Sequence, residues 1–71
     1  MNALAKLVKE ERKNLALTQA EFAKKLGLTA VSVCQIENGK IMGSTVIKKL
    51  SKYFKLQTRE IRYLMLKKEE N

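Results

Sequence analysis

Few side chains in this chain of 71 residues are of the types that perform catalysis. The sequence contains no His and no Asp, and Cys34 is its single cysteine. Imidazole general bases, Ser-His-Asp triads and His-based metal sites are therefore excluded. One thiol can form neither an internal disulfide nor a zinc site of several cysteines. We expect no catalytic residues, no metal site and no cofactor, and hence a protein that acts by binding rather than as an enzyme.

The side chains that remain are suited to binding a polyanion. Fifteen Lys and Arg against seven acidic residues, all Glu, give a formal net charge of +8. This charge favours nucleic acid or an anionic membrane surface as the partner, whereas the simplest alternative is a solvated, lysine-rich surface that serves solubility. The longest apolar run has four residues, Tyr63 to Leu66, which is too short to span a bilayer.

Helical periodicity and capping signals predict an all-α domain with no room for a sheet. Ser44 or Thr45 is expected to cap the fourth helix, and Thr58 to begin the fifth. Leu15 and Leu17, in the first connection, are expected to point inward. The five helices are expected at about 3–13, 19–25, 30–37, 46–54 and 58–66.

The length predicts one domain with one modest core, which we place at residues 1–66. Residues 67–71 are polar and are expected to form a frayed C-terminal tail. No secretory signal is visible, and the absence of a disulfide framework fits a reducing cytoplasm.

The segment from Gln19 to Asn38 has the spacing of a helix-turn-helix. Ala23, a small residue four positions before Gly27, lets two helices cross closely, and Gly27 permits a positive φ in the turn. Val33 and Ile36 then turn the second helix toward the core. A helical hairpin without a ligand is one interpretation of this spacing. The other is a helix-turn-helix whose second helix enters a major groove of DNA.

The sequence TQAEFAKKLGLTAVSVCQIENGK, residues 18–40, closely resembles the Cro/CI-type helix-turn-helix of phage and bacterial repressors. The resemblance extends more weakly from the first helix to about Leu64. It implies a five-helix, lambda-repressor-like DNA-binding domain with the helix-turn-helix at the second and third helices. It also implies a transcriptional regulator of the bacterial cytoplasm and nucleoid, with an operator in double-stranded DNA as its partner.

The resemblance assigns roles to individual residues around the third helix. Gln19 looks like the residue that hydrogen-bonds a DNA phosphate and braces the third helix. Thr29 is placed to donate its hydroxyl or backbone N–H to a phosphate at a helix N-terminus. The full set of expected phosphate contacts is Gln19, Thr29, Ser32, Asn38 and Lys40.

The expected base contacts lie on the outer face of the third helix, at Ala30, Val31, Cys34 and Gln35. Helical geometry supports this assignment independently, because these positions lie opposite the inward-facing Val33 and Ile36. Apolar side chains there suit thymine methyl groups, and Gln35 suits the edge of an adenine. For Ala30, helix propensity is an equally good explanation, and Cys34 is interpreted as a small groove-facing or half-buried side chain.

Arg12 and Glu37 match a helix 1 arginine and a helix 3 glutamate that pair beneath the recognition helix in the family. Without the resemblance, each would be interpreted as an exposed charge. With it, we expect a partly buried ion pair that fixes the third helix against the first.

A homodimer on a two-fold operator would double the DNA contacts of one such module. Leu56, Tyr63 and Met65 are the interface candidates, whereas Ile61 and Leu64 are expected inside. The leading hypothesis is a Cro-like repressor that occludes a promoter. Two alternatives stay open. The first is an antitoxin or a restriction-modification controller of the same fold, and an antitoxin would have a toxin as its protein partner. The second is a basic amphipathic module that binds a membrane surface or a protein partner.

Overall fold

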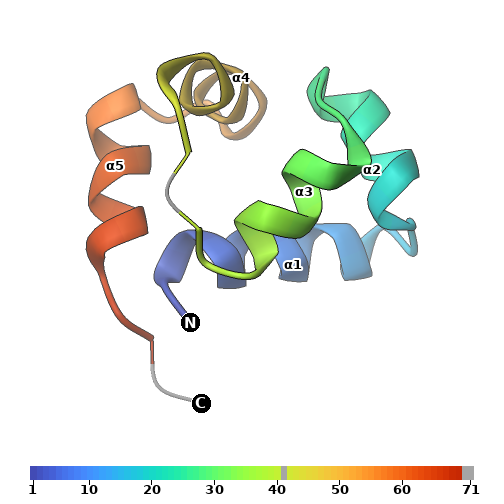
Figure 1. The fold of residues 1–71 in the computed structure, drawn as a ribbon, viewed down its shortest axis with the longest axis horizontal. Helices are drawn as coiled ribbons and strands as arrows, with labels where there is room; N and C mark the ends of the chain where they lie inside the picture. The colour runs from blue at the N-terminus through green and yellow to red at the C-terminus, as the bar shows by residue number, and fades with distance from the viewer. Residues whose placement is uncertain (41, 70–71) are drawn as a thin grey trace.

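The structure is a computed structural model that describes residues 1–40 and 42–69. Its helices are α1 (Ala3–Asn14), α2 (Gln19–Leu26), α3 (Ala30–Glu37), α4 (Ser44–Phe54) and α5 (Thr58–Leu66). Figure 1 shows α2 and α3 toward one end of the molecule and α5 at the other, with α1 running beneath them and α4 viewed nearly end-on. The predicted all-α, lambda-repressor-like class is confirmed. Within the described residues, the β-type pairing is one isolated bridge between Asn2 and Lys68.

Local capping signals explain where α2 begins and ends. The Thr18 hydroxyl accepts from the Glu21 backbone N–H at 3.1 Å, and the Glu21 carboxylate accepts from the Thr18 backbone N–H at 2.8 Å. This reciprocal capping box satisfies two donors that a helix start leaves unpaired. At the other end, Gly27 adopts φ +74°, a left-handed conformation that an L side chain disfavours.

The N-cap of α4 differs from the sequence-based expectation, whereas α5 begins at Thr58 as expected. Gly43, rather than Ser44 or Thr45, occupies the N-cap position of α4, and no side chain caps this end. Glycine is nevertheless among the residues that are favoured at the N-cap position. At α5 the N-cap is Gln57, whose backbone N–H donates to the Glu60 carboxylate at 2.9 Å.

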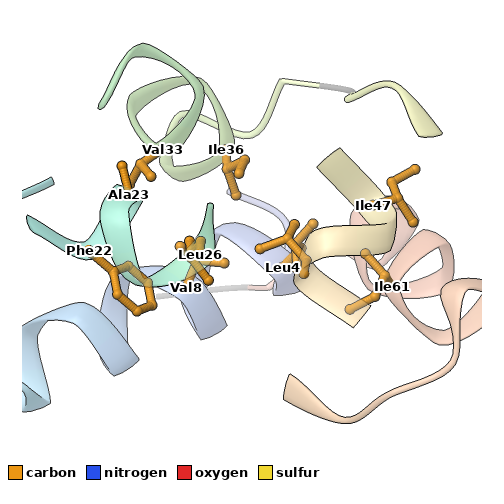
Figure 2. Close-up of a cluster of buried hydrophobic side chains, with 10 residues drawn as sticks. Leu4, Val8, Phe22, Ala23, Leu26, Val33, Ile36, Ile47 and Ile61 are labelled. Carbon is orange, nitrogen blue, oxygen red and sulfur yellow. The ribbon is translucent and has the colours of Figure 1, made fainter. Parts of the chain in front are cut away.

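All five helices contribute to the core. Figure 2 shows Phe22 and Val8 beneath α2, and Ile47 and Ile61 at the far end of the same cluster. Burial of each such side chain contributes about 1.5–3 kcal/mol relative to exposure. The full cluster comprises Leu4, Val8, Phe22, Ala23, Leu26, Val33, Ile36, Ile47, Leu50 and Ile61.

The residues expected to face the core do so with one exception. Ile61 is fully buried, as expected, and Leu64 is half-buried against the core. Leu17 also packs against the core, but the expectation for Leu15 is wrong, because 41 % of its surface is exposed. Ala16 takes a positive φ of 57° between them, which allows the two leucines to face in different directions.

The expectation of a frayed tail is wrong for Lys67–Glu69. The Ala3 backbone N–H donates to the Lys67 carbonyl at 2.8 Å, and the Glu69 N–H donates to the Met1 carbonyl at 3.0 Å. These bonds pair the segment after α5 with the N-terminus of the chain. Residues 70–71 of the expected tail lie outside the described residues. No helix in the described ranges is both long and apolar enough to cross a membrane.

Candidate nucleic-acid interface

The turn between α2 and α3 is closed by backbone hydrogen bonds around a glycine. The Leu28 N–H donates to the Ala23 carbonyl at 2.8 Å, and the Gly27 N–H donates to the Lys24 carbonyl at 3.3 Å. Ala23 is buried where the two helices cross. Lys49 of α4 adds a bond that sequence reasoning missed, because its Nζ donates to the Gly27 carbonyl at 2.6 Å. The turn of the helix-turn-helix is therefore fixed from both sides.

The two faces of α3 have opposite environments. Val33 and Ile36 are fully buried, whereas Val31 on the outer face is 66 % exposed. The other three expected base contacts, Ala30, Cys34 and Gln35, are half-buried. The structure thus places all four expected base contacts on the outer face of α3, with Val31 the most exposed. This face carries no charged side chain.

The start of α3 is organised by two hydroxyl groups. The Thr29 hydroxyl accepts from the Ser32 backbone N–H at 3.1 Å and donates to the Ser32 hydroxyl at 3.1 Å. Thr29 is thus the N-cap of α3, and its hydroxyl is already engaged within the protein. Of the two donors expected for Thr29, this arrangement favours the backbone N–H as the group that meets a phosphate.

The turn after α3 presents the other expected phosphate contacts. Gly39 has φ +79° and donates its N–H to the Ile36 carbonyl at 3.0 Å, while the Lys40 N–H donates to the Gln35 carbonyl at 3.0 Å. Asn38 is exposed, and its amide lies 3.5 Å from the Cys34 sulfur. Asn38 and Lys40 therefore project from a short turn whose backbone is held by α3.

An ion pair lies beneath α3. Arg12 donates from Nε to Oε2 of Glu37 at 2.7 Å and from an η nitrogen to Oε1 at 3.0 Å. A further η nitrogen donates to the Leu17 carbonyl at 3.0 Å, and the Gln19 amide donates to Glu37 Oε1 at 3.2 Å. The side chain of Gln19 therefore braces the end of α3 from the start of α2.

This network determines the ionisation of its two charged groups. Burial acts to raise the pKa of the Glu37 carboxyl, but hydrogen bonds from Arg12 and Gln19, with the charges of Arg12 and Lys9, outweigh it and lower the pKa below its ordinary value. The hydrogen bond to Glu37 raises the pKa of Arg12 against the effect of its own burial. Both groups are therefore charged at neutral pH, and the buried carboxylate is fully paired.

The three dimer candidates do not share one surface. Leu56 and Tyr63 line the same apolar hollow, together with Leu64, and Tyr63 is 62 % exposed. Met65 instead borders hollows at the other side of α5, beside Met42. Leu56 and Tyr63 are therefore the pair that a single interface could use.

Lysines gather in a hollow between α2 and α4. It is lined by Lys24, Lys25, Lys49 and Lys52, with Gly27 and Tyr53, and no glutamate of the described part of the chain borders it. This basic surface adjoins the turn of the helix-turn-helix.

Within the described ranges, no group of three His, Cys, Asp or Glu residues could hold a metal ion.

The sequence analysis does not predict two further contacts, one made by Asn2 and one made by Tyr53. Asn2 caps α1 and also reaches Gly39 in the turn after α3. The Tyr53 hydroxyl donates to the Glu11 carboxylate at 2.8 Å, and burial together with this bond raises the pKa of Tyr53. An asparagine just before the first helical residue is a recognisable N-cap signal, but neither long-range contact has a signal in the local sequence.

Comparison with known families gives one match. Residues 8–61, more than half of the chain, match the model of a family described as helix-turn-helix. The matched range contains all of α2, α3 and α4 and ends within α5. No curated protein matches the chain, and no solved structure does.

Proposed function

We propose that this chain, which belongs to the helix-turn-helix family of the Cro/XRE type, is a sequence-specific repressor that blocks a promoter by occupying its operator. Membership makes it a DNA-binding transcription regulator. The finer proposal adds three features: recognition of base sequence by α3, a homodimer on a two-fold site, and repression by occlusion of polymerase.

One observation carries the proposal: the outer face of α3 is uncharged and partly apolar in a chain with a net charge of +8. Val31, in the first turn of α3, is 66 % exposed on that face. Exposure of a branched apolar side chain to water is unfavourable, whereas contact with a thymine methyl group would remove its apolar surface from water. Gln35, one turn further along, has the amide that can donate to and accept from an adenine edge.

Four of the five expected phosphate contacts lie outside α3, and the fifth, Ser32, lies in its first turn with its hydroxyl bonded to Thr29. Gln19 and Thr29 stand at the starts of α2 and α3, and Asn38 and Lys40 stand in the turn that follows α3. Contacts of this kind fix the register of a protein on the duplex without reading its sequence. The arrangement therefore separates positioning groups from reading groups, as a sequence-specific binder requires.

The hollow at Leu56 and Tyr63 supports the proposed homodimer. Its lining is largely apolar, and Tyr63 offers a large, exposed ring with a polar edge. Two copies joined there would present two α3 helices to successive major grooves, at half-sites about 34 Å apart. Neutralisation by DNA would offset the repulsion between two chains that each carry +8.

The decisive experiment is selection of duplexes from a random-sequence library by the purified protein, followed by footprinting on the enriched site. We expect a two-fold site protected by two copies. Failure to enrich or protect any duplex at moderate salt would refute the proposal. Binding to anionic vesicles that survives Gln19→Ala and Gln35→Ala would instead favour a membrane-surface module.

A matched pair of lysine variants tests which charges meet the DNA. Lys40→Gln should reduce the slope of log K against log salt by about 0.9, the value for one phosphate contact. Lys55→Gln, at the C-terminal end of α4, should leave the slope unchanged. Equal slopes for the two variants would contradict the assignment of Lys40 to the interface.

Tyr63→Ser tests the proposed dimer interface. This variant should convert two-copy binding into one-copy binding on the selected site.

A further inference from the structure

The side chain of Asn2 makes two hydrogen bonds to different parts of the fold. Its Oδ1 accepts from the Ala5 backbone N–H at 2.7 Å, which caps the start of α1. Its Nδ2 donates to the Gly39 carbonyl at 3.3 Å, across 37 positions of the sequence. The orientation of the amide is fixed chemically, because only the oxygen can accept from Ala5 and only the nitrogen can donate to Gly39.

Gly39 is the central residue of the turn that presents Asn38 and Lys40. Its positive φ directs the chain away from α3, and the Lys40 N–H closes the turn on the Gln35 carbonyl. A Cβ added at Gly39 would lie 3.6 Å from Asn2 Nδ2, so the Asn2 amide packs close to the side of this glycine where a side chain would stand. Asn2 is thus the contact that joins the start of α1 to this turn.

The backbone of Asn2 is held in turn by the segment after α5. Asn2 and Lys68 form an antiparallel bridge. The bonds from Ala3 to Lys67 and from Glu69 to Met1 lie on either side of it. A residue so near the end of a chain is ordinarily mobile, but these bonds give Asn2 a fixed backbone from which its side chain reaches Gly39.

We propose that Asn2 is a positioning residue of the DNA interface. Held by Lys67–Glu69, it fixes the Gly39 carbonyl and thereby sets the direction in which Asn38 and Lys40 meet the phosphate backbone. This inference rests on the proposed function, since it assigns a role within the same interface. It adds that Asn2 and the segment Lys67–Glu69 influence DNA affinity through the turn after α3.

The two hydrogen bonds of Asn2 can be separated by substitution. Asn2→Ser keeps a good N-cap acceptor for Ala5, but its side chain is too short to reach Gly39 and carries no amide. We expect a melting temperature close to that of the original protein. DNA affinity should fall about 3- to 10-fold, the size of effect expected for the loss of one hydrogen bond.

A second variant covers the case in which serine disturbs folding. Asn2→Asp also keeps the cap, and a carboxylate at the start of a helix is favourable. It cannot donate to Gly39, and its charge repels the carbonyl oxygen. Asn2→Asp should therefore weaken DNA binding at least as much as Asn2→Ser does, while α1 stays folded by circular dichroism.

A double-mutant cycle distinguishes positioning from a general structural effect. If Asn2 acts through the turn, Asn2→Ser should cost less affinity in a Lys40→Gln background than in the original protein, because one of the two contacts it positions is already gone. The salt slope of Asn2→Ser should also fall toward that of Lys40→Gln. Additive losses with an unchanged slope would overturn the inference. So would an affinity of Asn2→Ser equal to that of the original protein.

Amide hydrogen exchange keeps this inference separable from the proposed function. In the free protein, exchange at the Gly39 and Lys40 amides should accelerate in Asn2→Ser, while exchange within α1 stays unchanged. If the original protein binds no duplex, the proposed function fails. The exchange data then still decide whether Asn2 holds the turn, and unchanged exchange at Gly39 and Lys40 would refute it.

Discussion

Arg12 joins α1 to the last residue of α3 through two parallel hydrogen bonds to Glu37, 2.7 and 3.0 Å long. The Glu37 residue is only 5 % exposed, and Gln19 at the start of α2 donates to the same carboxylate. Three helices of the domain therefore meet at one charged group. Because a guanidinium and a carboxylate pair in one plane, this contact fixes the orientation of α3 as well as its distance from α1.

Glu37→Ala should reduce stability and DNA binding together. The substitution leaves the Arg12 guanidinium without its partner in a partly buried position and removes the acceptor used by Gln19. Breaking one side of a buried pair typically costs about 3–5 kcal/mol. Urea denaturation should show a loss of this size in the free energy of unfolding, and DNA binding should weaken in the same variant.

Glu10→Ala is the matched control on α1, since Glu10 is exposed. Its free energy of unfolding should change by no more than about 0.5 kcal/mol. A Glu37→Ala protein that melts like the original but no longer binds DNA would show that the pair contacts the DNA interface without supporting the fold.

The lowered pKa of Glu37 predicts a specific loss of stability in acid. The pKa of the Glu37 carboxyl is lower in the folded state than in the unfolded state, where the pKa of glutamate is about 4.3. The ionised carboxyl therefore stabilises the fold at every pH above the unfolded pKa. That stabilisation disappears as the pH falls from this value through the lower, folded one. Denaturation midpoints measured across this range should fall more steeply for the original protein than for Glu37→Gln. Parallel curves would contradict the shift.

Features that depend on neighbouring residues could be predicted from the sequence. The bounds of α3 follow from the cap at Thr29 and the stop at Asn38 and Gly39, and the structure places α3 at 30–37 as expected. The capping box at Thr18 is equally local, since both of its partners lie within four residues. Periodicity then places Val33 inward and Val31 outward without any knowledge of the other helices.

Contacts between distant residues could not be predicted in the same way. The bond from Asn2 to Gly39 and the pairing of Lys67 with Ala3 depend on how the finished fold brings chain segments together. The pairing of Arg12 with Glu37 follows from the family resemblance alone, because their sequence separation of 25 gives no local signal. The exposure of Leu15 cannot be predicted from its apolar character, because nothing local indicates that the neighbouring Ala16 takes a positive φ.

Two glycines should respond to substitution with opposite signs. Gly27 has φ +74°, and the nearest atoms to a new Cβ are 3.8 Å away on Lys49, so Gly27→Ala should lose about 1–2 kcal/mol from backbone strain alone. Gly43 has φ −73° and open space around it, in the N-cap position of α4. Gly43→Ser should gain a few tenths of a kcal/mol through a new cap. Thermal denaturation of both variants checks the signs, and a stabilised Gly27→Ala would contradict the left-handed turn.

Gln35→Ala should change which sequences are bound more than how strongly DNA is bound. The Gln35 amide stands on the outer face of α3 beside Val31, where one bidentate contact to a base discriminates by about 1–3 kcal/mol. Competition binding with single-position variants of the selected duplex should show preference lost at one base pair in each half-site, with non-specific affinity preserved. Gln57→Ala, at the exposed start of α5, should alter neither property. A uniform loss of affinity across all sequences would instead make Gln35 a phosphate contact or a structural residue, and base reading would then rest on Val31, Ala30 and Cys34.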